Sequence, residues 1–251
     1  MIFFIIALVI AAILPPMPQP LSYHEFVDQR SFLRVPNFLN VASNLIFLFV
    51  GIAGLVFLRR TKMASSQKTF AALSECWPYF IVFLSAILVS AGSAYYHWEP
   101  DNNTLFWDRL PIATGIMSLL AASVIEHIGI KQGLRLLPVL VVTGIASVVH
   151  WYWSELQGAG NLNFYIVVQF CSILIIVLLA ILFPSRYTRE KDIYAVISLY
   201  ALAKLVELLD KEIYHLAQII SGHTLKHILA GLAVYWVLRM LKRRQLVEKF
   251  N

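Results

Sequence analysis

Two histidines stand four residues apart in the stretch "SGHTLKHILAGLAVYWVLRM", which covers positions 221–240. Residues four apart share one face of a helix, so His223 and His227 should present their imidazoles on the same side. The rest of the stretch is apolar and ends in a basic tail, which is typical of a membrane-spanning helix. Ionisable groups in such helices usually face the bundle interior or a water-filled cavity. This histidine pair is therefore a candidate site.

A second group of polar residues occurs in "SAGSAYYHWEPDNNTLFWDRLP". Ser93 and His97 are four residues apart and should share a helix face, and Asp108 follows after a short loop. Each residue also has an ordinary structural interpretation. Ser93 can bond a backbone carbonyl within a membrane helix, and Asp108 can cap the helix that it opens.

Three imidazoles from these two segments suit zinc, which prefers nitrogen ligands in tetrahedral geometry and keeps one position open for water in catalytic sites. The spacing therefore predicts a zinc site formed by His97, His223 and His227. Zinc lowers the pKa of its bound water toward about 7. Asp108 could accept a proton from that water or orient a histidine, and Ser93 could donate a hydrogen bond to the oxyanion.

The elements that would hold these residues belong to a membrane protein. The 251-residue chain is 59% hydrophobic and 14% charged, whereas soluble domains are about 45–50% apolar and about 25% charged. The net charge of +6 does not arise from a basic patch of the kind that binds nucleic acid. The two cysteines, Cys76 and Cys171, lie in different hydrophobic segments and indicate no disulfide framework. We therefore expect a single polytopic membrane domain.

The predicted fold is an all-α bundle of seven transmembrane helices plus a short N-terminal hydrophobic helix. A span needs ~20 residues, and the runs that reach or approach this length are 38–58, 78–97, 105–127, 134–153, 162–183, 193–213 and 222–240. Residues 1–14 are interpreted as an N-terminal helix or uncleaved signal-like anchor, because a basic start and an A-x-A site are lacking. Residues 15–37 are expected to form an extracytoplasmic loop, and 38–251 the seven-helix domain.

The distribution of lysine and arginine predicts the orientation. Of the 20 basic residues, 14 fall on every second connection, at 59–77, 129–135, 184–192 and in the tail from 239 onwards. Cytoplasmic loops carry an excess of these residues. We therefore expect a cytoplasmic C-terminus, and a site that lies in the extracytoplasmic half of the membrane.

Three blocks of the sequence resemble alkaline ceramidases, in the family's order. "GHTLKHILAGLA" resembles the G-H-x-x-x-H motif of the last helix, and "SAGSAYYHWEPDNNTLFWDRLP" resembles the S-x-x-x-H block with its following aspartate. "PNFLNVASNLIFLFVGIAGL" resembles the N-x-x-S-N-L block of the first helix. The resemblance covers about 38–240 and is closest to bacterial-type members, which implies a bacterial inner membrane.

The resemblance implies zinc held by His97, His223 and His227, with Ser93 and Asp108 as catalytic partners. It also implies that attack of metal-bound water hydrolyses the amide of ceramide, giving a sphingoid base and a fatty acid. The sphingolipid substrate follows from the family alone. No protein partner can be deduced.

Calcium is a further expectation from the same family, whose eukaryotic members carry an acidic calcium motif before the first helix. Here Asn37 stands where the motif's last glutamate would be, and Glu25 and Asp28 supply other oxygen ligands. The alternative is that Glu25 and Asp28 pair with Arg30 and Arg34 to fold the loop.

Other function classes stay open from the sequence. The zinc core could serve another lipid hydrolase, acting on an ester or a different amide, or a non-enzymatic seven-helix receptor-like protein. A transporter would show paired broken helices in two repeats, and no such halves occur here. Lys204, Glu207 and Asp210 form a charged group in the sixth run, to which no catalytic role is assigned.

Overall fold

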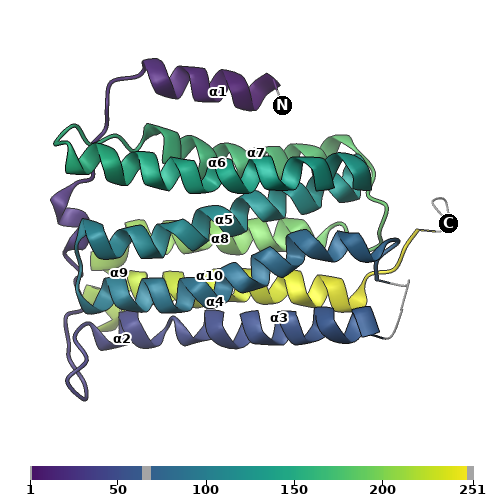
Figure 1. Ribbon diagram of the computed structural model, residues 1–251. Coiled ribbons are helices and arrows are strands. Elements are labelled where there is room, and N and C mark those ends of the chain that lie inside the picture. The colour runs from purple at the N-terminus through teal and green to yellow at the C-terminus, as the bar shows by residue number, and fades with distance from the viewer. Residues whose placement is uncertain (1, 64–68, 248–251) are drawn as a thin grey trace.

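The computed structural model describes residues 2–63 and 69–247, and these residues form a helical bundle without a strand (Figure 1). The predicted all-α class is confirmed. Two short 3₁₀ turns, η1 (Leu21–His24) and η2 (Leu73–Glu75), accompany the α-helices. The helices are α1 (Ile2–Ile13), α2 (Phe38–Ala42), α3 (Leu45–Met63), α4 (Cys76–Trp98), α5 (Asn102–His127), α6 (Ile130–Leu156), α7 (Asn163–Leu182), α8 (Asp192–Leu208), α9 (Asp210–Ala217) and α10 (Gly222–Arg243).

Six helical segments among the described residues are long and apolar enough to cross a membrane. They are Phe38–Met63, Leu73–Trp98, Asn102–His127, Ile130–Leu156, Asn163–Leu182 and Gly222–Arg243. These segments correspond to six of the seven predicted spans, so the chain is an integral membrane protein by length and composition. The predicted count of seven is not confirmed.

The sixth predicted span, 193–213, divides into two helices. α8 has 17 residues, and the helical geometry is interrupted at Leu209 (φ −96°, ψ 25°), where α9 begins a new direction. The carboxylate of Asp210, just after this break, accepts a hydrogen bond from the backbone N–H of His223 at 2.7 Å. The break therefore places a polar group against the start of α10.

The predicted N-terminal hydrophobic segment is helical and packs beside α7 (Figure 1). The chain leaves α1 through a proline-rich stretch, where the Asn163 side-chain amide donates to the Pro15 carbonyl at 2.9 Å. Residues 15–37 then cross the end of the bundle at which α4 ends and α10 begins. This segment is the main cover over that end.

A close contact between α4 and α5 brings their polar residues together. A Cβ atom built on Gly92 would lie 2.1 Å from the carbonyl oxygen of Trp107, well inside any permitted distance. Only glycine allows this approach, because it has no side chain. The contact brings the backbone at Asp108 beside the helix turn that carries Ser93.

An apolar cavity of about 330 Å³ extends from this end into the bundle, between α4, α5, α7, α8 and α10. On α10 its wall runs from Lys226 to Val237, a rise of about 16 Å at 1.5 Å per residue. Most of the lining is aliphatic or aromatic, and the charged side chains include Asp108 and Glu207. A cavity of this size and character suits an apolar chain with a polar head.

A buried arginine organises the opposite end of the bundle. Arg244 is 3% exposed, and its guanidinium lies over the rings of Phe70, Tyr79 and Tyr187 at 4.1–5.2 Å. It forms an ion pair with Glu126 of α5. A buried charge with a partner is far less costly than a buried charge alone. This pair ties the segment after α10 to α4 and α5.

Candidate metal centre

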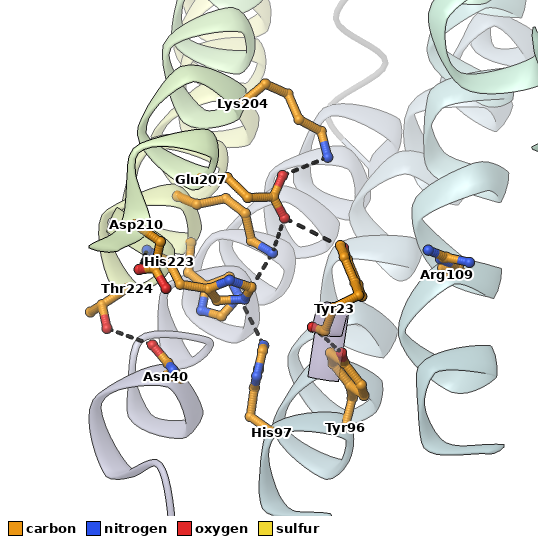
Figure 2. A network of polar contacts seen from close by, with 12 residues as sticks. Tyr23, Asn40, Tyr96, His97, Arg109, Lys204, Glu207, Asp210, His223 and Thr224 are labelled. Atoms are coloured by element: carbon orange, nitrogen blue, oxygen red, sulfur yellow. Dashed lines mark hydrogen bonds and ion pairs between the residues drawn. The ribbon is translucent and has the colours of Figure 1, made fainter. Parts of the chain in front are cut away.

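The three predicted histidines come from the ends of two helices, and Figure 2 shows two of them, His97 and His223, close to each other. His97 lies in the last turn of α4, whereas His223 and His227 occupy the first two turns of α10. Ser221 caps α10 by accepting a hydrogen bond from the backbone N–H of Thr224 at 3.1 Å. This cap and the Asp210 carboxylate satisfy N–H groups that a helix start leaves unpaired.

The three side chains form a compact buried cluster. His97, His223 and His227 are 0%, 5% and 3% exposed, and one nitrogen from each lies within 4.8 Å of the others. The Nε2 atoms of His97 and His227 are 3.2 Å apart. Nitrogen ligands about 2.1 Å from a tetrahedral zinc ion would be separated by about 3.4 Å, so this donor set fits a metal ion. The prediction that the three histidines meet is confirmed.

Ser43 fixes the orientation of His227. The Ser43 hydroxyl lies 2.8 Å from Nδ1 of His227 and donates its own proton to the Asn40 carbonyl at 3.1 Å. The hydroxyl therefore accepts the Nδ1–H of His227, which leaves the lone pair on Nε2. Metal-ligating histidines are oriented in this way by a partner on the other ring nitrogen.

The segment before α2 holds His97 in place. The Asn37 amide donates to the backbone carbonyl of His97 at 2.8 Å, and the ring of Phe26 packs against the rings of His97 and His223 at 4.6 and 4.9 Å. Nδ1 of His97 has no hydrogen-bond partner among the described residues. The Nε2 atom of His97 is thus the nitrogen that faces the other imidazoles.

Lys226 is an additional charged group at the centre. Its ammonium donates to Nε2 of His223 at 3.0 Å and pairs with Glu207 at 2.9 Å. The other carboxylate oxygen of Glu207 pairs with Lys204 at 2.8 Å. Because the ammonium occupies the His223 Nε2 lone pair, it competes with any cation that would use that nitrogen.

Ser93 and Asp108 lie beside each other on the cavity wall, next to His227. They are 2% and 6% exposed, and Oδ1 of Asp108 has no hydrogen-bond partner among the described residues. Asp108 does not cap its helix, because Asp101 does so by accepting from the N–H of Thr104 at 2.7 Å. Asp108 lines the cavity beside Ser93, so its carboxylate is placed to act on a molecule there.

The three calcium candidates make other contacts. Asp28 is buried and paired with Arg30 at 2.7 Å, and hydrogen bonds from this guanidinium hold the pKa of Asp28 below its usual value. Asn37 bonds the His97 carbonyl, and the side chain of Glu25 is exposed. The pairing of Asp28 with Arg30 was one of the two sequence interpretations, and it is confirmed. Calcium stays an untested expectation.

Two contributors to the centre were not assigned from sequence. Ser43 lies in the quoted N-x-x-S-N-L block, and its contact with His227 joins positions 184 residues apart. Lys226 was visible as a charge inside an apolar helix, which is the usual sign of a functional or paired group. For neither Ser43 nor Lys226 does the sequence indicate which residue the side chain contacts.

The chain matches no protein-family model, and no curated protein matches it. The functional conclusion therefore depends on the geometry of the centre and on the sequence motifs.

Proposed function

We propose that this protein is a zinc-dependent intramembrane amidase that hydrolyses a ceramide-like lipid to a sphingoid base and a fatty acid. The observation that carries the proposal is the buried cluster of His97, His223 and His227, of which His227 lines an apolar cavity. Ser93 and Asp108 line the same cavity. The three sequence blocks that resemble alkaline ceramidases contain all five of these residues.

When bound, a zinc ion supplies Lewis-acid chemistry and makes water a nucleophile at neutral pH. The residues of the chain perform the proton transfers. Asp108, on the cavity wall, accepts the proton of the attacking water and passes it to the leaving amine nitrogen. The Ser93 hydroxyl donates a hydrogen bond to the oxygen that becomes negatively charged.

The cavity accounts for a lipid substrate. An acyl chain along α10 would displace no ordered polar contact, because the inner part of the wall is apolar. The amide then lies at the polar end, within reach of Asp108 and Ser93. The connections rich in lysine and arginine lie at the other end of the bundle (Figure 1), so we place the centre on the extracytoplasmic side of a bacterial inner membrane, with the C-terminus in the cytoplasm.

The test combines metal analysis of the purified protein with hydrolysis of defined ceramides, with and without a chelator. We expect about one zinc per chain by the three-histidine stoichiometry, and loss of hydrolysis after chelation. His223→Ala should lose metal and activity together, whereas Asp108→Asn should keep metal and lose turnover. His215→Ala is the matched control, because His215 is exposed on α9.

Hydrolysis by His223→Ala at the parent rate would refute the mechanism. A product screen by mass spectrometry over amide and ester lipids separates a ceramidase from another lipid hydrolase with the same core. Stoichiometric zinc with no lipid product would instead favour a receptor-like protein in which the metal is structural.

A further inference from the structure

Arg109 is a buried cation on the cavity wall that has no carboxylate partner. It is 6% exposed, and no carboxylate oxygen of the described residues lies within 4.0 Å of it. Its guanidinium lies over the rings of Trp151, Tyr165 and Tyr23 at 4.2, 4.9 and 5.5 Å. Nη2 donates to the side-chain carbonyl of Gln19 at 2.6 Å, whereas Nη1 has no partner among the described residues.

A comparison with Arg244 shows which interaction Arg109 lacks among the described residues. Both arginines are buried and both lie over three aromatic rings, but Arg244 also pairs with Glu126. Aromatic faces and one neutral amide offset only part of the cost of burying a charge. The missing contribution at Arg109 is an anionic oxygen.

The charges around the polar end of the cavity point to the same missing group. Arg109, Lys204 and Lys226 line the cavity together with only two carboxylates, Asp108 and Glu207. Glu207 is already shared between the two lysines. In Figure 2, Arg109 lies on the far side of Tyr23 from Glu207 and Lys204. The cations thus stand on both sides of Tyr23, with an excess of positive charge.

We propose that Arg109 binds an anionic oxygen group of the lipid whose chain occupies the cavity. The substrate class is then a ceramide-like N-acyl lipid that carries a carboxylate or phosphate group. The assignment of this headgroup to the substrate rests on the proposed function. The guanidinium of Arg109 keeps N–H bonds that no described residue accepts, so it can bind such a group through charge-assisted hydrogen bonds.

The test measures binding and needs no turnover. Dodecyl phosphate and its neutral dimethyl ester are titrated into the protein in a neutral detergent, and the affinity is measured by calorimetry. We expect the parent to prefer the anion by about tenfold, which corresponds to the net value of one charged hydrogen-bonding interaction. Arg109→Gln should abolish this preference, and Arg109→Lys should keep part of it.

A control variant and a second variant make the binding measurement interpretable. Arg135→Gln is the matched control, because Arg135 is exposed near the start of α6, and it should leave the preference unchanged. Arg109→Lys serves as the second test if Arg109→Gln fails to fold, because it keeps the charge but loses the planar guanidinium, so the preference should fall in part. An undiminished preference in a folded Arg109→Gln or Arg109→Lys protein would overturn the proposal.

Two more ligands identify the source of the anion. Dodecanoate should bind through Arg109 as dodecyl phosphate does, whereas inorganic phosphate should bind at least tenfold more weakly because it lacks the chain. Equal affinity for inorganic phosphate would overturn the assignment to an amphiphile. A protein that binds the anions through Arg109 but hydrolyses no amide would refute the proposed function alone.

Discussion

Individual side chains of the metal centre differ in how far the sequence predicts them. His223 and His227 follow from helical spacing, and His97 follows from the chain topology, because both helix ends fall on the same side of the membrane. The contacts of Ser43 and Lys226 depend on how helices distant in sequence pack together. Spacing within one helix carries no information on such contacts.

Ser43→Ala tests the orientation of His227. The substitution removes the acceptor for His227 Nδ1–H, so the ring is free to rotate and to change tautomer. Loss of such an orienting partner typically weakens metal binding 10–100-fold, and we expect a weakening of about tenfold. Competition with a zinc-chelating dye measures it. Ser22→Ala is the control, because Ser22 is exposed in η1, and an equal loss in both proteins would contradict the role of Ser43.

Lys226→Met tests the competition for His223. Methionine keeps the apolar stem but removes the ammonium that bonds His223 Nε2, so zinc should bind more tightly. We expect a gain of about tenfold, because one charged hydrogen bond no longer has to break. The same dye competition measures it, with exposed Lys211→Met as the control. Weaker zinc binding by Lys226→Met would show that the ammonium supports the centre.

At the level of helices, hydropathy predicted seven spans, six of which correspond to helical segments long and apolar enough to cross a membrane, and it missed the break at Leu209. The run 193–213 is apolar enough to suggest one helix, and its charged residues are compatible with a polar lining inside the bundle. The break is a tertiary effect. A Cβ on Gly222 would lie 2.0 Å from the carbonyl oxygen of Val206, so α10 starts against the last turns of α8, and Asp210 turns toward it.

Gly92→Ala tests the contact between α4 and α5. The added methyl group would lie 2.1 Å from the Trp107 carbonyl oxygen, and a backbone atom in a packed helix cannot move aside as a side chain can. We expect a loss of about 1–3 kcal/mol in the free energy of unfolding, and turnover reduced more strongly because Asp108 shifts from Ser93. Thermal unfolding and ceramide hydrolysis measure the two effects.

Gly115→Ala is the control for this substitution. It lies on α5, and its Cβ would meet the Ser85 side chain at 3.2 Å, a contact that small movements relieve. An equal loss of turnover in both variants would show that the Gly92 contact has no special part in positioning Asp108.

For the whole molecule, composition alone predicted an all-helical membrane protein, since 59% hydrophobic residues cannot be accommodated in a soluble domain of this size. The arrangement of residues 15–37 could not be predicted in the same way. This segment has no periodicity, and its order comes from pairs such as Asp28 with Arg30 and His24 with Tyr96. The first pair is local and was one of the sequence interpretations, whereas the contact of His24 with Tyr96 joins positions 72 residues apart and depends on how the helices assemble.

The packing of this segment should depend on pH. Burial lowers the pKa of His24, despite the opposing hydrogen bond to Asn102 and the charge of Asp101. Because the folded state disfavours the protonated ring, its contribution to stability is present above the ordinary pKa of about 6.5 and is lost as the pH falls through the lowered value. Thermal unfolding at pH about 7.5 and about 5.5 measures this.

The His24→Gln variant separates this effect from that of the other histidines. Glutamine does not titrate, so the difference in melting temperature between the two pH values should be smaller than in the parent. An equal difference in both proteins would assign the acid sensitivity to other groups.

The ring of Phe26 also governs how fast a metal ion can enter or leave. The ring packs against two of the three imidazoles, so we expect an ion that arrives from the aqueous side to displace it. The other route to the site runs through the apolar cavity, where the loss of an ion's hydration shell is unfavourable. We therefore expect a metal ion at the three histidines to exchange slowly, so that chelation and dye competition reach equilibrium only after long incubation.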